Sequence, residues 1–259
     1  MLDEVRSSVC AIGWLDGTPD QYLADRGRFK VVGTGFLIAE TTAMTNRHVV
    51  QRVLDCQRNR NVPQDRLLLL FTYPGDSGWK ESFCRIKGIG LTDSANPDVG
   101  FIEFARCPEP EFGLCKPLHP ADLSNVQVGY HVAAFGFPYG NKSLTIEVKG
   151  SEGEVLERIG RFGPILQKGY ISATTPFGSK VSEADRVLLD MRIAGGMSGS
   201  PVFDPVNGMV VGIIYAGRGE GLDGTVFAVA VPLDETRIMN WLHVYRQEQG
   251  KAEVISRSG

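Results

Sequence analysis

Short apolar runs bounded by turn residues recur along the whole chain. They fall at 9–14, 31–39, 67–71, 83–89 and 99–104 in the first half, and at 128–136, 143–148, 169–173, 187–193, 201–203, 209–215 and 225–231 in the second. Several alternate between apolar and polar residues, as strands with one buried face do. Strands at this density, with few helical stretches between them, predict barrels or sandwiches rather than alternating strands and helices.

Two helices are expected among these strands. A short one should cover 48–54, and a second should begin near Asp234, because an acidic pair suits the first turn of a helix. The second helix has one apolar face for packing on a barrel, made by Ile238, Trp241, Leu242 and Tyr245. The segment 116–120 (KPLHP) contains two prolines that cannot donate to a strand ladder, so we interpret it as an interdomain connector.

Composition fits a globular protein rich in turns. The chain has 259 residues, 42% hydrophobic and 22% charged, which excludes wholesale disorder and allows a core without a metal or disulfide. Glycine is in excess, with 31 residues, and no repeat explains it. This excess favours a turn-rich, largely β protein.

Charge and apolar patterning exclude several partners. The balance of 30 acidic and 27 basic residues gives a net charge of −3, and the basic stretch 58–60 is expected to be a solvated loop, so no nucleic-acid partner is expected. No apolar run is long enough to predict a membrane span. The segment 1–6 lacks the basic and apolar regions of a signal peptide, which predicts a cytoplasmic location.

The five cysteines form an odd set without a CxxC pair. Their spacing offers neither a disulfide framework nor the ligands of a zinc site. We therefore expect reduced, mostly buried thiols, no metal and no cofactor. Reduced thiols also fit a cytoplasmic protein.

The sharpest chemical signal is the run 195–201 (GGMSGSP). Ser198 stands there at a backbone turn where the amides of Gly196 and Ser198 can point toward one small volume. A tetrahedral acyl intermediate needs two such donors beside its nucleophile. The run is compatible with either a nucleophilic serine or an ordinary glycine-rich hairpin.

A serine is unreactive unless a base takes its proton, so the four histidines are the next candidates. His48 follows an apolar strand and begins the first expected helix, whereas His131 and His243 fit structural positions. A catalytic histidine also needs an acceptor that orients its ring. Asp98 stands at the mouth of strand 99–104, where alone it would be a turn or capping residue.

Taken together, these residues fit one known order. The succession His48, Asp98, Ser198 matches chymotrypsin-like triads, in which the histidine and aspartate come from one barrel and the serine from the next. An α/β-hydrolase would run serine, acid, histidine and would need a glycine where Ser200 stands. That alternative is excluded.

The sequence resembles the trypsin-like serine peptidases, and within them the bacterial HtrA-type and glutamyl endopeptidases. The matching segments are 33–38 (GTGFLI), 45–50 (TNRHVV), 98–102 (DVGFI), 134–140 (AFGFPYG), 196–203 (GMSGSPVF) and 211–217 (VGIIYAG). The resemblance implies an all-β fold of two six-stranded antiparallel barrels with a C-terminal helix. It divides the chain into a first barrel at 1–118 with the histidine and aspartate, a second barrel and helix at 119–249 with the serine, and a flexible tail at 250–259.

The same resemblance implies a serine endopeptidase acting on polypeptides through an acyl-enzyme. Ser198 would attack, and His48 would act first as base and then as acid. Asp98 would fix the histidine tautomer, and the amides of Gly196 and Ser198 would stabilise the oxyanion.

A specificity pocket is expected near the nucleophile. The pocket residues implied by the resemblance are Arg192, Ile213, Ile214, Tyr215, Ala216 and Gly217. Arg192 replaces the pocket-floor acid of trypsins, and Ile214 replaces the histidine with which glutamyl endopeptidases bind acidic side chains. We expect a small or medium apolar residue before the cut. Arg192 would favour an acidic residue if it reaches the pocket, and would have no such role if it forms a surface salt bridge.

Regulation and two competing functions stay open. Trypsins are activated when a freed N-terminal amine pairs with an aspartate directly before the nucleophile. Here that position is Met197, so this zymogen switch has no counterpart. Activity that depends on conformation or on an activating protein partner is therefore expected. The alternatives are a protease-fold interaction module with latent or no activity, and an esterase that uses the same triad.

Overall fold

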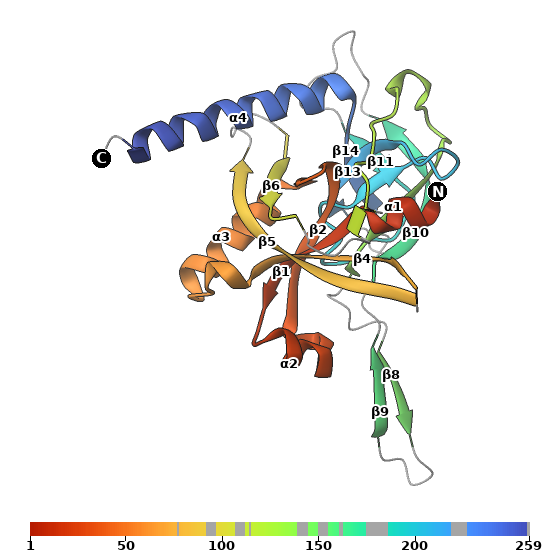
Figure 1. The fold of residues 1–259 in the computed structure, drawn as a ribbon. Helices are drawn as coiled ribbons and strands as arrows, with labels where there is room; N and C mark the ends of the chain where they lie inside the picture. The colour runs from red at the N-terminus through yellow and green to blue at the C-terminus, as the bar shows by residue number, and fades with distance from the viewer. Residues whose placement is uncertain are drawn as a thin grey trace.

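The computed structural model describes residues 1–76, 78–91, 97–106, 112–113, 115–138, 145–149, 155–160, 163–174, 186–218 and 227–257. Cys107 and the last two residues of the run 134–140 lie outside these ranges. Figure 1 shows the strands gathered into two bodies, with one long helix at the C-terminal end.

The first barrel is closed and antiparallel, in the order β1-β2-β3-β6-β5-β4. Its strands are β1 (Val9–Leu15), β2 (Phe29–Ala39), β3 (Thr42–Thr45), β4 (Leu67–Gly75), β5 (Gly78–Leu91) and β6 (Gly100–Phe104). The apolar runs of the first half account for five of these six strands. The sixth, β3, is a four-residue strand that completes the barrel by pairing with β2 and β6.

The second barrel is also closed, in the order β10-β11-β14-β13-β12-β7. Its strands are β7 (His131–Gly136), β10 (Ile165–Thr174), β11 (Val187–Leu189), β12 (Pro201–Phe203), β13 (Val210–Arg218) and β14 (Phe227–Pro232). Two further strands, β8 (Thr145–Lys149) and β9 (Val155–Gly160), pair only with each other, and in Figure 1 they extend away from both barrels. The predicted double barrel of six-stranded sheets is confirmed.

Helices cover the barrels rather than form a layer of their own. The α-helices are α1 (Leu2–Ser7), α2 (Pro19–Ala24), α3 (Arg47–Asn59) and α4 (Glu235–Arg257), and the 3-10 helices are η1 (Arg26–Arg28), η2 (Gln64–Arg66) and η4 (Leu123–Asn125). Helix α3 is longer than the expected 48–54 because Val53 and Cys56 continue its buried face. Helix α2 was not expected, although Thr18 and Gln21 form a capping box at its start.

Helix α4 runs past the point where a loose tail was expected to begin. Its backbone stays helical through Gly250 and ends at Arg257. A glycine inside a helix costs only about 1 kcal/mol relative to alanine, so Gly250 need not end it. The flexible tail expected at 250–259 stays a prediction.

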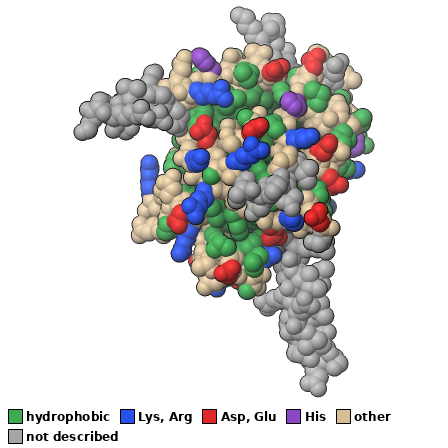
Figure 2. Space-filling model, in the orientation of Figure 1, with side chains coloured by type: hydrophobic (Ala, Val, Ile, Leu, Met, Phe, Trp, Pro, Cys, Tyr) green, Lys and Arg blue, Asp and Glu red, His purple; other side chains and the backbone are tan. Residues whose placement is uncertain are grey.

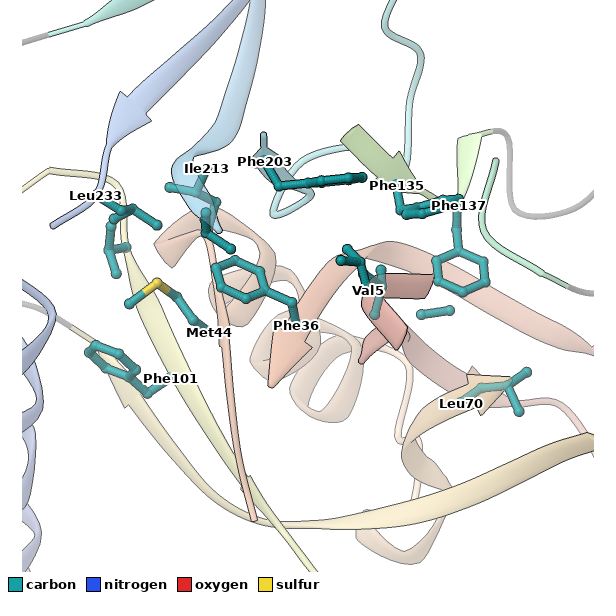
Figure 3. Close-up of a cluster of buried hydrophobic side chains, with 14 of the residues drawn as sticks. Val5, Phe36, Met44, Leu70, Phe101, Phe135, Phe137, Phe203, Ile213 and Leu233 are labelled. Atoms are coloured by element: carbon teal, nitrogen blue, oxygen red, sulfur yellow. The ribbon is translucent and has the colours of Figure 1, made fainter. Parts of the chain in front are cut away.

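A single apolar cluster joins the two barrels (Figure 3). Phe36 and Met44 enter it from β2 and β3, and Ile213 and Phe203 enter it from β13 and β12. Phe203 stacks on Phe135 of β7 with ring centroids 5.7 Å apart. Because these side chains are excluded from water, the cluster holds the barrels in one orientation and fixes what lies at their junction.

The chain changes barrels between Leu118 and His119. The Leu118 amide donates to the Leu37 carbonyl of β2 at 2.8 Å, and the His119 carbonyl accepts from the Val210 amide of β13 at 2.8 Å. This crossing lies in the proline-containing segment 116–120, and the division into two domains between 118 and 119 stays a prediction.

Helix α4 follows the second barrel but packs on the first. The Tyr245 ring stacks on Phe101 of β6 at a centroid distance of 5.7 Å. Gly90 of β5 lies directly beneath that ring, where an added Cβ would overlap it. The packing of α4 on β5 therefore requires glycine at position 90.

The surface carries both signs of charge. In Figure 2, acidic and basic side chains are interspersed over the face shown.

Among the described residues, no helix combines the length and the apolar character needed to cross a membrane. Cys10, Cys56, Cys84 and Cys115 are buried, and none of these four forms a disulfide.

Candidate active site

The structure brings His48 and Asp98 together at the edge of the first barrel. Strands β3 and β6 are neighbours, with Thr45 opposite Gly100. His48, three residues after Thr45, and Asp98, two residues before Gly100, therefore lie close together. His48 Nδ1 lies 2.5 Å from Asp98 Oδ2. The other carboxylate oxygen, Oδ1, accepts the backbone N–H of His48 at 2.9 Å. Both oxygens therefore hold the same histidine in place.

The Asp98 carboxylate also satisfies the start of helix α3. Asn46 is the N-cap residue, but its side chain does not cap the helix; its amide Nδ2 donates instead to the Asp98 carbonyl at 2.9 Å. The free N–H of His48 in the first turn is accepted by Asp98 in its place. The same carboxylate thus satisfies a backbone donor at the start of α3 and orients the His48 ring.

Solvent reaches this pair only in part. The side chains of His48 and Asp98 are 33% and 25% exposed, while Asn46 is fully buried. A short hydrogen bond that is partly shielded from water is stronger than the same contact in bulk solvent. The ring is thus oriented through Nδ1, which leaves Nε2 free to act on another group.

Ser198 lies in the turn between β11 and β12. Gly196 and Gly199 on either side have φ values of +100° and +90°, which are left-handed conformations that favour glycine. In this loop the amides of Met197, Gly199 and Ser200 donate to the carbonyls of Ala194, Ile214 and Met197. The amides of Gly196 and Ser198, the predicted oxyanion donors, have no acceptor among the described residues. Two donors are therefore left for a ligand.

Strand β2 brings this loop to the histidine. The Thr34 amide donates to the Ser198 carbonyl at 2.8 Å. A Cβ added to Gly33 would lie 3.1 Å from that carbonyl oxygen and 2.6 Å from the Val49 methyl carbons. Ser198 and the first turn of α3 thus lie on either side of Gly33. Among the contacts of the described residues, no hydrogen bond joins Ser198 Oγ to His48; such bonds are often long without substrate.

The expected pocket residues do not share one environment. Arg192 is exposed, whereas Ile213 and Ile214 are fully buried, the first in the cluster between the barrels and the second inside the second barrel. Tyr215 is half-buried, with the Arg186 guanidinium 5.0 Å from its ring centroid. The remaining two, Ala216 and Gly217, pair in β13 with Val229 and Ala228 of β14. Because both isoleucine side chains lie in the core, neither of them lines a pocket for a substrate side chain.

Within the described ranges, no group of three or more His, Cys, Asp or Glu side chains is placed to hold a metal ion. Two residues at the site were not singled out by sequence reasoning. Asn46 and Thr34 both lie in recognised segments, but only their side-chain contacts reveal that they hold Asp98 and the serine loop.

Two closed antiparallel barrels, with a histidine–aspartate pair on the first and a glycine-flanked serine of the second bound to the first through Thr34, define the class of chymotrypsin-like peptidases. The family model of the trypsin-like peptidase domain matches residues 33–213, and the chain belongs to this family.

Among solved structures, the chain is similar to Rv3671c from M. tuberculosis H37Rv, in the crystal structure of a serine-to-alanine mutant in an inactive form. That similarity has 19% identity and a TM-score of 0.52, over 96% of this chain and 90% of that one. A second structure, of Rv3671c protease in an inactive form, has 17% identity and a TM-score of 0.49, over 93% and 90%. At this identity the first similarity supports the fold alone. No curated protein matches the chain.

Proposed function

We propose that this peptidase domain is a serine endopeptidase that hydrolyses peptide bonds through an acyl-enzyme. The observation that carries the proposal is the His48–Asp98 pair, in which both carboxylate oxygens bind one histidine and leave its Nε2 available. Asp98 fixes the tautomer, His48 takes the proton of Ser198 and later gives it to the leaving amine, and Ser198 forms the acyl bond.

The free amides of Gly196 and Ser198 support the same mechanism. During attack, negative charge develops on the carbonyl oxygen of the substrate, and two preorganised donors stabilise it in the transition state. For specificity we propose a small or medium apolar residue before the cut, because Arg192 and Ile214 replace the pocket acid of trypsins and the pocket histidine of glutamyl endopeptidases. The exposed Arg192 provides the alternative, a preference for an acidic residue.

Met197 shows how the nucleophile loop is anchored without an ion pair. Its side chain is 1% exposed and packs in the core of the second barrel with Val202, Val132 and Ile214. A buried thioether carries no charge and cannot form an ion pair with an amine. An N-terminal amine freed by cleavage would therefore find no partner at Met197. We propose that control comes instead from a protein partner or a conformational change.

Labelling with a fluorophosphonate tests the proposal directly. The wild type should be labelled once, and Ser198→Ala should abolish the label. Ser200→Ala is the matched control: Ser200 is fully buried and, among the described residues, its Oγ has no hydrogen-bond partner, so its label should persist. A folded wild type that takes up no label, with or without candidate partners, would refute an active peptidase.

A latent interaction module is the second candidate, because Ser198 Oγ has no hydrogen bond to His48 among the described contacts. The two differ in the response to a partner: the latent form should gain labelling when the partner is added, and an inactive module should not. Cleavage of a peptide library, compared with hydrolysis of simple esters, separates an endopeptidase from an esterase on the same triad.

A further inference from the structure

Thr34 uses every polar group it has to join the two halves of the site. It is fully buried in β2. Its amide donates to the Ser198 carbonyl at 2.8 Å, and its hydroxyl donates to the Gly196 carbonyl at 2.7 Å. The same hydroxyl accepts from the Phe137 amide at 3.1 Å. Its carbonyl accepts from the Thr45 hydroxyl at 2.6 Å, three residues before the catalytic histidine.

These contacts pin the peptide planes around the nucleophile. The plane between Gly196 and Met197 is held at its carbonyl by the Thr34 hydroxyl and at its amide by Ala194. The next plane is held at the Met197 carbonyl by the amide of Ser200, which aims the Ser198 N–H to the opposite side. The second of these planes carries the Ser198 N–H, and the first adjoins, at the Gly196 Cα, the plane that carries the Gly196 N–H. Holding both planes therefore restricts the two amides that would receive the oxyanion.

We propose that Thr34 is a positioning residue for the oxyanion hole: from the first barrel its hydroxyl fixes the Gly196–Met197 peptide, which lies between the peptides that carry the two donors, and thereby preorganises both. This inference rests on the proposed peptidase mechanism. It also gives the hydroxyl a role that packing alone would not require, since valine has nearly the same shape and cannot bond to either backbone group.

Loss of the hydroxyl should act on the transition state. Thr34→Val removes the partner of the Gly196 carbonyl and of the Phe137 amide but keeps the Thr34 amide on Ser198. Loss of a whole oxyanion donor costs on the order of 10²–10³ in rate. Two donors that are still present but less firmly positioned should therefore lower kcat by about 10–100-fold. KM should change by less than about threefold, because substrate in the ground state carries no oxyanion.

The experiment compares Thr34→Val, Thr34→Ser and Thr72→Val with the wild type. Thr72 is the matched control: it is fully buried in the same barrel, and its hydroxyl has no hydrogen-bond partner among the described residues. Fluorophosphonate labelling to completion counts the competent sites, and hydrolysis of p-nitrophenyl acetate gives kcat and KM per competent site. A merely structural role would reduce the number of sites and leave kcat per site unchanged.

The inference predicts a lower kcat per site for Thr34→Val, recovery to within about threefold of the wild type for Thr34→Ser, and no loss for Thr72→Val. If the valine variant does not fold, Thr34→Ala takes its place, because alanine has no γ-methyl to press against the Gly196 carbonyl and the Phe137 amide. The same values are expected for it. An unchanged kcat per site in the folded variant, or no recovery with serine, overturns the inference. A wild type that takes up no label overturns the peptidase proposal instead.

Discussion

Gly199→Ala should damage the junction of the two barrels. Gly199 has a φ of +90°, which costs alanine roughly 1–2 kcal/mol. Its new Cβ would overlap the Thr34 carbonyl oxygen and lie 3.0 Å from the carbonyl carbon, both part of the backbone of β2. Relief requires β2 to move away from Ser198, which breaks the Thr34–Ser198 hydrogen bond and costs roughly another 1–3 kcal/mol.

The sum, roughly 2–5 kcal/mol, should lower Tm by about 5–15 °C in a chain of this size. Thermal unfolding followed by circular dichroism measures the change, and fluorophosphonate labelling at 25 °C reports whether the site survives. Gly195→Ala is the matched control, because no atom lies within 4 Å of its added Cβ and its φ is not left-handed. A Gly199→Ala protein that melts within about 2 °C of the wild type would refute the close approach of the two barrels.

Three further changes test other parts of the molecule. Asp98→Asn should lower kcat by roughly 10⁴ in peptide hydrolysis through loss of the correct His48 tautomer, and near-full activity would remove Asp98 from the triad. Burial first, and then the negative charge of Glu81, raise the pKa of the Tyr22 phenol. The folded form therefore keeps a proton that the unfolded chain loses near pH 10; this stability is complete below about pH 10 and is lost above it. Urea unfolding from pH 9 to 11 should show a weaker decline for Tyr22→Phe, and equal slopes would contradict this. Burial also raises the pKa of the Cys10 thiol, so mass spectrometry should find it unmodified by iodoacetamide in the folded protein at pH 8.5 and modified in urea; modification in the folded protein would contradict its burial.

Hydrophobic patterning predicted barrels or sandwiches, and the resemblance to trypsin-like peptidases, with the order His48, Asp98, Ser198, predicted the double barrel and the triad. Of those three, the structure shows direct contact for His48 and Asp98, while the catalytic roles rest on the experiments above. The triad was accessible because one histidine and one aspartate stand at strand ends in the order that the two-barrel fold requires.

Other elements carry weaker signals. Strand β3 has only four residues, too few for a periodic pattern, and is defined by its partners β2 and β6. The Thr34–Gly196 contact joins positions 162 residues apart, and nothing in either local sequence specifies the other. The capping box of α2 was readable from Thr18 and Gln21, so that helix could have been expected.

The seat of α4 on the first barrel has a consequence for biosynthesis. The first barrel has all six of its strands once Phe104 has left the ribosome, but the position above Gly90 and Phe101 stays open until Tyr245 follows. At about 5–20 residues per second, the nascent chain would present that apolar surface for roughly 10–30 s. During this interval the new barrel is a natural client for chaperones, and a ribosome that stalls before Tyr245 would leave it uncovered.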